Sequence, residues 1–125
     1  MLDIVQTDRA PDDIGPFSQA VRANGFLFVS GQIPMDPRTR ELSHGDLPTQ
    51  AELVLRNLAA VLEAGGSSLD RVVKVGVFLK DMGEFARFNE IYARFFPPPL
   101  PARTTVEAAR LPKDILVEID AIALT

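Results

Sequence analysis

Hydrophobic residues follow a helical spacing in two segments of the chain. In the first, Asp46 can cap a helix whose first turn accommodates Pro48, and Gly65-Gly66 ends it. In the second, Asp81 and Glu84 have the spacing of a capping box, and a run of three prolines stops the helix. Apolar side chains recur at Val54, Leu55, Leu58, Val61 and Leu62, and at Phe85, Phe88, Tyr92, Phe95 and Phe96. The pattern predicts two amphipathic helices.

Other segments have the patterning of β-strands. Asn24-Gly25 between apolar runs is the strongest hairpin signal, because a type I′ turn needs a positive φ at both central residues. Residues 72–79 are apolar on both faces, which is typical of a central strand. Two more strands, at about 103–109 and 115–124, are expected to form a hairpin around the turn at 111–114.

These elements predict an α+β layer structure in a single domain of residues 1–125, with a mainly antiparallel sheet and both helices packed on one face. The helices can cover only one side of residues 72–79. The open face of the sheet is therefore expected to pack against other copies of the chain. The pattern predicts an oligomer but does not fix the number of copies.

Composition and charge narrow the function classes. The chain has no cysteine and one histidine, which excludes disulfides, thiolate catalysis and His-cluster metal sites. A net charge of -4 argues against a nucleic-acid partner, because phosphate binding depends on clustered Lys and Arg. No apolar run approaches the roughly 20 residues of a membrane span. The N-terminus lacks the features of a signal peptide, so a cytoplasmic location is expected.

Arg103 and Glu118 are the candidates for chemistry. A guanidinium matches a carboxylate in two parallel hydrogen bonds. Glu118 shares its side of a strand with Leu116 and Ile122, and aliphatic neighbours raise the pKa of a carboxyl and make it a usable base. On the expected hairpin the two side chains would suit a small carboxylate ligand and a water-activating base. The alternatives are a surface ion pair of Arg103 with Glu107 or Glu118, and a solvent-exposed Glu118.

Three further positions have open interpretations. Ser30-Gly31 follows a strand, where a glycine lets a ligand approach the backbone, although a simple strand-ending turn fits the same pattern. Asn89 lies on the aromatic helix and, from the pattern alone, is an ordinary surface amide. His44 occupies a polar loop and is expected to be solvated rather than catalytic.

Four separated motifs resemble the RidA family, also called the YjgF/YER057c/UK114 family. The similarity runs from about Ala10 to the C-terminus, with the motifs in family order and at family-like spacing. The motifs are Ala10-Pro11, then Ile14 to Ala20, then Ser30 to Pro34, and finally Pro101-Ala102-Arg103 with Ala109 to Asp114.

The resemblance implies a homotrimer of a chorismate-mutase-like fold, with sheets facing inward and intersubunit sites. It also implies a deaminase without metal or cofactor that acts on reactive enamines and imines such as 2-aminoacrylate, 2-iminopropanoate and 2-iminobutanoate. These compounds are by-products of pyridoxal-phosphate dehydratases, and their hydrolysis yields 2-keto acids and ammonia.

The resemblance also assigns roles to single residues. It implies that Arg103 clamps the substrate carboxylate and that Glu118 activates the attacking water. Backbone groups at Ser30-Gly31 and at Thr105 would contact substrate, and Asn89 would line the rim of the pocket. These roles supply the sites that composition and spacing leave open.

Two positions need separate mention. Phe17 stands where relatives commonly have Tyr, so the aromatic wall is kept and the hydroxyl is lost. Asp120 lies on the same strand face as Glu118 but matches no family role, and it is interpreted as structural or solvated.

Alternative functions remain open from the sequence. A trimer that binds 2-keto acids for regulation could have kept Arg103 and lost catalysis, for which Phe17 is the best hint. A specialised deaminase acting on 2-aminomuconate also fits. A ribonuclease or translation inhibitor follows from names attached to the family, and the acidic charge weighs against it.

Overall fold

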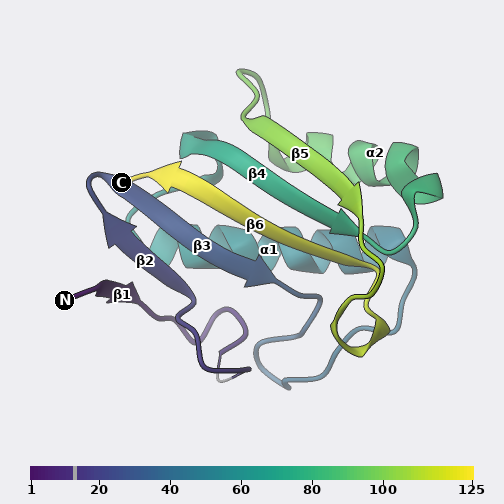
Figure 1. Ribbon diagram of the computed structural model, residues 1–125, viewed down its shortest axis with the longest axis horizontal. Coiled ribbons are helices and arrows are strands. Elements are labelled where there is room, and N and C mark those ends of the chain that lie inside the picture. The colour runs from purple at the N-terminus through teal and green to yellow at the C-terminus, as the bar shows by residue number, and fades with distance from the viewer. Residues whose placement is uncertain (13) are drawn as a thin grey trace.

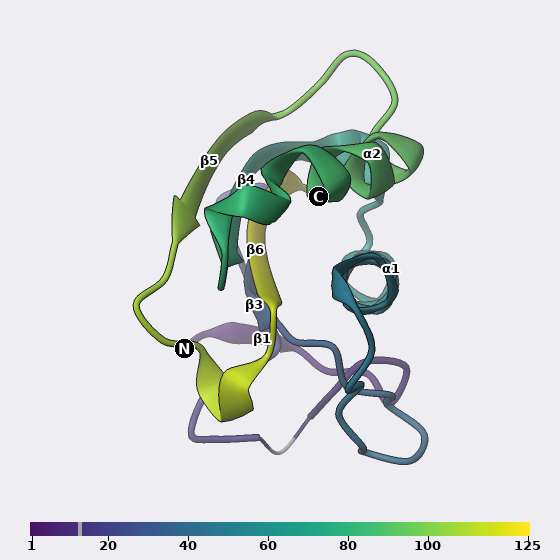
Figure 2. The ribbon, with the colours of Figure 1, turned by 90° about the vertical axis from the view of Figure 1, so that its right-hand side faces the viewer.

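Six strands form one sheet, and two helices lie on one side of it (Figures 1 and 2). The computed structural model describes residues 1–12 and 14–125. The strands run in the spatial order β1-β2-β3-β6-β4-β5. Their bounds are β1 Asp3–Val5, β2 Ala20–Ala23, β3 Phe26–Gln32, β4 Val72–Leu79, β5 Ala102–Glu107 and β6 Val117–Leu124, and the helices are α1 Leu47–Ala64 and α2 Phe85–Phe95. The predicted α+β class is confirmed.

Helix α1 begins and ends where the sequence predicts. The Asp46 carboxylate accepts hydrogen bonds from the backbone N–H of Thr49 at 3.1 Å and from its hydroxyl at 2.8 Å. These bonds satisfy a free donor of the first turn and hold the pKa of Asp46 below its ordinary value. At the other end, the N–H of Gly65 donates to the carbonyl of Val61 at 3.0 Å. The predicted apolar residues of α1 are buried.

Helix α2 begins one turn later than the capping signal predicts. Asp81 accepts a hydrogen bond from the N–H of Gly83 at 2.8 Å, but residues 82–84 form a 3-10 turn and α2 starts at Phe85. The carboxylate of Glu84 accepts a hydrogen bond from Arg87 at 3.2 Å. Phe88 and Tyr92 of α2 are buried, as the helical spacing predicts.

One predicted hairpin is confirmed and the other is wrong. Asn24 and Gly25 have φ values of 51° and 81°, and they join β2 to β3. The last two strands form no hairpin, because β4 lies between them. Helix α2 makes a crossover connection, so β5 returns parallel to β4, and β6 then pairs with the other edge of β4. The prediction that β4 is a central strand is thereby confirmed.

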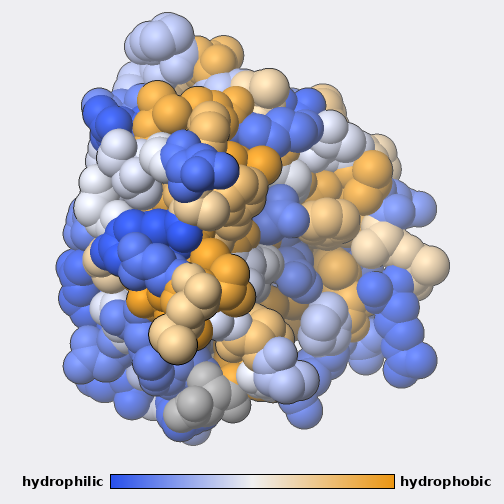
Figure 3. Space-filling view, turned by 60° about the vertical axis from the view of Figure 1, so that its left-hand side comes forward, coloured by the Kyte–Doolittle hydropathy of each residue, from blue (hydrophilic) through white to orange (hydrophobic). Residues whose placement is uncertain are grey.

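The two faces of the sheet differ in cover. We call the side packed on α1 and α2 the helix face and the other side the open face, which Figure 1 views directly. Val75, Val77 and Ile119 are buried on the helix face. On the open face Phe26 and Phe28 keep 38% and 44% of their surface exposed. Hydrophobic areas also lie between hydrophilic ones in the oblique view of Figure 3.

Buried amides fasten α1 to the segments around the sheet. Asn57 is 2% exposed, and its Nδ2 donates to the carbonyls of Ile33 at 3.0 Å and Met35 at 2.9 Å. Gln50 accepts a hydrogen bond from the N–H of Leu116 at 2.9 Å, just before β6. These bonds fix the segments that follow β3 and precede β6. Among the described residues, no helix combines the length and the hydropathy that a membrane span needs.

The role of Asn57 leads to a stability prediction. Asn57→Leu leaves the two carbonyls without their buried donor, so the free energy of unfolding should fall by about 2 to 4 kcal/mol. Urea unfolding at a fixed protein concentration measures this change. Arg56→Ala is the matched control on the exposed side of the same helix, where loss of the ion pair with Glu52 should cost about 0.5 kcal/mol or less. Equal losses in the two variants would contradict the assignment.

Candidate functional site

The predicted site residues form two clusters on opposite faces of the sheet. The first, called the Arg103 cluster, lies between β5 and α2 on the helix face. It consists of Arg103, Thr105, Phe85, Phe88, Asn89 and Tyr92. The second, called the Glu118 cluster, lies on the open face where β3 meets β6. It consists of Glu118, Ser30 and Gly31.

The guanidinium of Arg103 is held by an amide and by aromatic rings. Its Nη2 donates to Oδ1 of Asn89 at 2.7 Å. Its Cζ lies 4.6 Å from the ring centroid of Tyr92 and 5.5 Å from those of Phe85 and Phe88. Cation–π attraction to these rings and the short bond to Asn89 restrict the side chain.

Within residues 1–12 and 14–125, no carboxylate forms a salt bridge with Arg103. The alternative that pairs Arg103 with Glu107 or Glu118 is wrong, because the Glu107 carboxylate accepts a hydrogen bond from the N–H of Met82 at 2.9 Å and Glu118 lies on the other face. A half-buried guanidinium without a counter-charge is suited to bind an anionic ligand, above all a planar carboxylate.

Two hydroxyl groups of the Arg103 cluster are buried. In the described part of the chain, neither the Tyr92 hydroxyl nor Oγ1 of Thr105 has a hydrogen-bond partner. Burial raises the pKa of Tyr92, and the positive charge of Arg103 opposes that rise. Strand β5 is also an edge strand, so one side of its backbone has no neighbouring strand within the chain. The backbone of Thr105 therefore remains a candidate ligand contact.

Glu118 is packed against a glycine. It lies opposite Phe78 of β4, and on its other side a Cβ atom at position 31 would collide with its carboxylate. Only glycine leaves room for this close approach. The register of β3 on β6 shifts between Val29 and Gln32, at the point where Gly31 meets Glu118. Burial raises the pKa of Glu118, and the nearby charge of Asp120 raises it further. The direction agrees with the sequence argument for a usable base.

Ser30 connects the Glu118 cluster to the segment that carries Phe17. Its hydroxyl donates to the carbonyl of Ser18 at 2.6 Å, and its N–H donates to the carbonyl of Gln19 at 2.9 Å. The buried side chain of Gln19 donates in turn to the carbonyls of Ala10 and Pro11 at 3.2 Å and 2.8 Å. Phe17 itself is 57% exposed. The structure thus places Ser30 and Gly31 beside Glu118 and leaves the Phe17 ring free to contact another molecule.

A single chain does not bring Arg103 and Glu118 together. Arg103 is aligned with Val75, whose side chain is buried on the helix face, whereas Glu118 is on the open face opposite Phe78. Strand β4 separates the two residues. The expectation that a hairpin sets them side by side is therefore wrong, because β5 pairs with β4 instead of β6. Any site that uses both residues needs groups from two chains.

The remaining predictions have mixed outcomes. His44 is exposed in its loop, as predicted. Asp120 is half-buried on the open face beside Gly76, so it is not simply solvated. The sequence pattern does not predict the ring contacts of Arg103. Phe85, Phe88, Asn89 and Tyr92 lie within about two helical turns, but the same aromatic spacing is typical of a helix face in the core.

Comparison with known proteins gives concordant matches over nearly the whole chain. Residues 7–125 match the family model described as Endoribonuclease L-PSP. A RutC family protein of Pyrococcus horikoshii is 54% identical over 123 residues, covering 98% of each chain. A putative endoribonuclease from Thermotoga maritima has a TM-score of 0.95 at 52% identity, covering 100% of this chain and 98% of that one. E. coli TdcF with bound serine has a TM-score of 0.93 at 43% identity, covering 98% of each.

Tyr92 offers a direct test of the Arg103 cluster, because it is the only tyrosine in the chain. We expect its phenol to ionise above the ordinary pH, since burial raises its pKa. Arg103→Met should move the ionisation to still higher pH, because the guanidinium charge that favours the phenolate is gone. Ultraviolet absorbance of the phenolate measures both titrations. Arg94→Met, on an exposed part of α2, is the control, and an Arg103 variant that titrates like the wild type would contradict the stacking.

Proposed function

Because this chain belongs to the RidA (endoribonuclease L-PSP) family, we propose that it hydrolyses reactive enamines and imines to 2-keto acids and ammonia. The proposed substrates are small and carry a carboxylate, such as 2-aminoacrylate with its tautomer 2-iminopropanoate, and 2-iminobutanoate. A cytoplasmic location would place the protein beside the dehydratases that release such compounds.

The observation that carries this proposal is the state of Arg103. Its guanidinium is positioned by Asn89 and by three aromatic rings, and no salt bridge among the described residues neutralises it. Such a group favours a ligand with a planar carboxylate. E. coli TdcF, 43% identical, was solved with bound serine, which is a small carboxylate ligand. That precedent supports the same ligand class for this chain.

The proposed mechanism assigns one task to each residue. Arg103 binds the substrate carboxylate and orients the imine carbon. Glu118 accepts a proton from a water molecule, whose oxygen attacks that carbon to give a tetrahedral carbinolamine. Glu118 returns this proton to the nitrogen, then takes the proton of the new hydroxyl and passes it to the amine, so that the C–N bond breaks, ammonia leaves and the C=O bond forms. Backbone groups at Gly31 and Thr105 would hold the substrate in place, and no nucleophilic side chain is needed.

We propose that the site forms between chains of a homotrimer. Arg103 and Glu118 lie on opposite faces of one sheet, so the second residue must come from a neighbouring chain. The exposed aromatic residues of the open face and the free edge of β5 are suitable for such packing. Light scattering coupled to gel filtration tests the assembly, and a monomer at micromolar concentration would remove the shared site.

One observation favours a second candidate. Phe17 keeps an exposed aromatic wall but lacks the hydroxyl that typical relatives place beside the reacting carbon. A regulatory trimer that binds 2-keto acids without turnover would tolerate that loss. Deamination of 2-aminomuconate is a narrower version of the leading proposal. Nuclease activity is disfavoured, because the net charge of -4 opposes phosphate binding.

A coupled assay separates these functions. An amino-acid oxidase or dehydratase generates imines in situ, and ammonia release is followed with and without the protein over a panel of amino acids. Faster release supports the deaminase. Tight binding of a 2-keto acid with no acceleration on any imine would favour the regulatory trimer. Cleavage of RNA by nuclease-free preparations, lost in Arg103→Ala, would favour the nuclease.

Glu118→Gln separates chemistry from binding. The amide keeps the size of the side chain and cannot accept the proton, so turnover should fall by roughly 10²- to 10⁴-fold while affinity for a 2-keto acid changes little. In the wild type, kcat/KM should rise with pH along a limb that lies above the range of an ordinary glutamate, because the pKa of Glu118 is raised. Steady-state ammonia release and product binding measure the two effects. If affinity collapses together with turnover, Glu118 is not the base.

Arg103→Ala should reduce kcat/KM by about thirtyfold or more, because a charged ligand group loses its paired donor. Arg103→Lys should rescue poorly, since an ammonium lacks the planar fork. Arg94→Ala is the control. Mixing then tests the shared site: Arg103→Ala and Glu118→Gln proteins, inactive alone, should regain activity when refolded together. In a random equal mixture about a quarter of the sites would combine both native residues. No recovery in mixed trimers would contradict the intersubunit site.

A further inference from the structure

A second carboxylate lies beside Glu118 on the open face. Asp120 follows it by two residues on β6, so the two side chains project to the same side about 7 Å apart along the strand. Each carboxylate packs against a glycine of a neighbouring strand. A Cβ atom at Gly31 of β3 would collide with Glu118, and one at Gly76 of β4 would collide with Asp120. The two acids are therefore packed against backbone rather than free in solvent.

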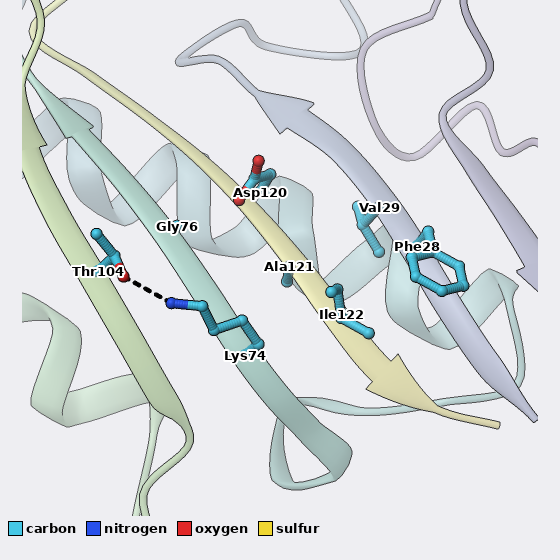
Figure 4. A pocket seen from close by; sticks show the side chains of 8 residues that line it. All are labelled: Phe28, Val29, Lys74, Gly76, Thr104, Asp120, Ala121 and Ile122. Carbon is cyan, nitrogen blue, oxygen red and sulfur yellow. Dashed lines mark hydrogen bonds between the residues drawn. The ribbon is translucent and has the colours of Figure 1, made fainter.

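Asp120 lines a shallow cavity of about 450 Å³ on this face (Figure 4). Lys74 of β4 reaches into the same cavity, and its Nζ donates to the hydroxyl of Thr104 on β5 at 2.7 Å. Lys74 is not within salt-bridge distance of Asp120 among the described ion pairs. It acts on the carboxylate through its charge across the cavity and is held there by Thr104.

The surroundings leave few other charges to act on the pair. The side chains of β3 on this face, Phe26, Phe28 and Ser30, are uncharged, and Lys74 is the ionisable group contributed by β4. Thr104 of β5 is uncharged, and the Arg103 of the same chain is on the helix face, so the Arg103 that the proposed shared site brings to Glu118 belongs to a neighbouring chain. Burial raises the pKa of Asp120, whereas hydrogen bonding to the backbone of Gly76 and, next, the charge of Lys74 oppose that rise. Burial and the charge of Asp120 both raise the pKa of Glu118. Partial burial strengthens such interactions relative to water.

We infer that Asp120 is a positioning residue that acts through Glu118: the two acids titrate as a coupled pair, with Lys74 as counter-charge, and the pair decides when Glu118 can accept a proton. This inference rests on the proposed function for its consequence, which is that Asp120 and Lys74 contribute, together with the groups of the shared site, to the pH range of hydrolysis. Asp120 contacts no substrate in this account. At the acidic end of the pH profile, kcat/KM rises with pH; the position of this acidic limb is determined by both carboxyl groups rather than by Glu118 alone.

Two charge-removing variants should move the acidic limb of kcat/KM in opposite directions. Asp120→Asn removes a negative charge, so Glu118 loses its proton at lower pH. At a fixed pH on the acidic limb, kcat/KM divided by its plateau value should be about threefold or more higher than in the wild type. Lys74→Met removes a positive charge, so the pair retains protons to higher pH and the same ratio should fall. Glu63→Gln, an exposed acid on α1 behind the helix face, is the control and should leave the limb in place.

A second measurement does not depend on activity. Carbon-13 NMR follows the glutamate carboxyl signals through a pH titration, and Glu118→Gln identifies the signal of Glu118. That signal should titrate at lower pH in Asp120→Asn and at higher pH in Lys74→Met. A Glu118 titration that is unchanged in both variants overturns the coupling, even if imine hydrolysis is present. A shifted titration without any imine hydrolysis supports the coupling and refutes the proposed function.

Discussion

Strand β4 pairs on both of its edges, and the placement of Arg103 and Glu118 depends on that pairing. Its parallel ladder with β5 aligns Arg103 with Val75, and its antiparallel ladder with β6 sets Glu118 opposite Phe78. Because side chains alternate along a strand, these two alignments send the guanidinium to the helix face and the carboxylate to the open face. A slip of one residue in either ladder would reverse one of them. The buried Val75, Val77 and Leu79 prevent such a slip.

The charged groups of the candidate site are separated in the same way between the helix face and the open face. On the helix face a cation is surrounded by aromatic rings and an amide, which hold it without neutralising it. On the open face two acids lie against backbone, and the charge of Lys74 acts on one of them, Asp120. The helix face thus offers the positively charged group of the proposed site, and the open face offers its carboxylates. Neither face holds both. A small ligand that carries a carboxylate at one end and an electrophilic carbon at the other could engage both faces only at a junction between chains.

The local parts of this fold could be predicted from the sequence, whereas the decisive long-range pairing could not. Asp46 and Asn24-Gly25 determine their helix start and turn through contacts within a few residues. The turn at 111–114 also gives a local signal, which favours a hairpin. In the structure it is a 3-10 turn with positive φ at Lys113 and Asp114, and it leads β6 to the far edge of β4. Parallel pairing through α2 leaves no local signature, so the sequence offers Arg103 and Glu118 as candidates but predicts the wrong geometry between them.

The glycines that receive the two acids also limit how this sequence can diverge. At position 31 any side chain would occupy the space of the Glu118 carboxylate, and at position 76 any side chain would occupy that of Asp120. A side chain at either glycine position would force the acid beside it to move, and a shorter residue at 118 or 120 would leave a gap above the backbone. Substitutions are therefore expected to be correlated between positions 31 and 118 and between positions 76 and 120. Among distant descendants of this chain, loss of the glycine at position 31 would indicate that the acid at 118 had been lost or had taken another conformation.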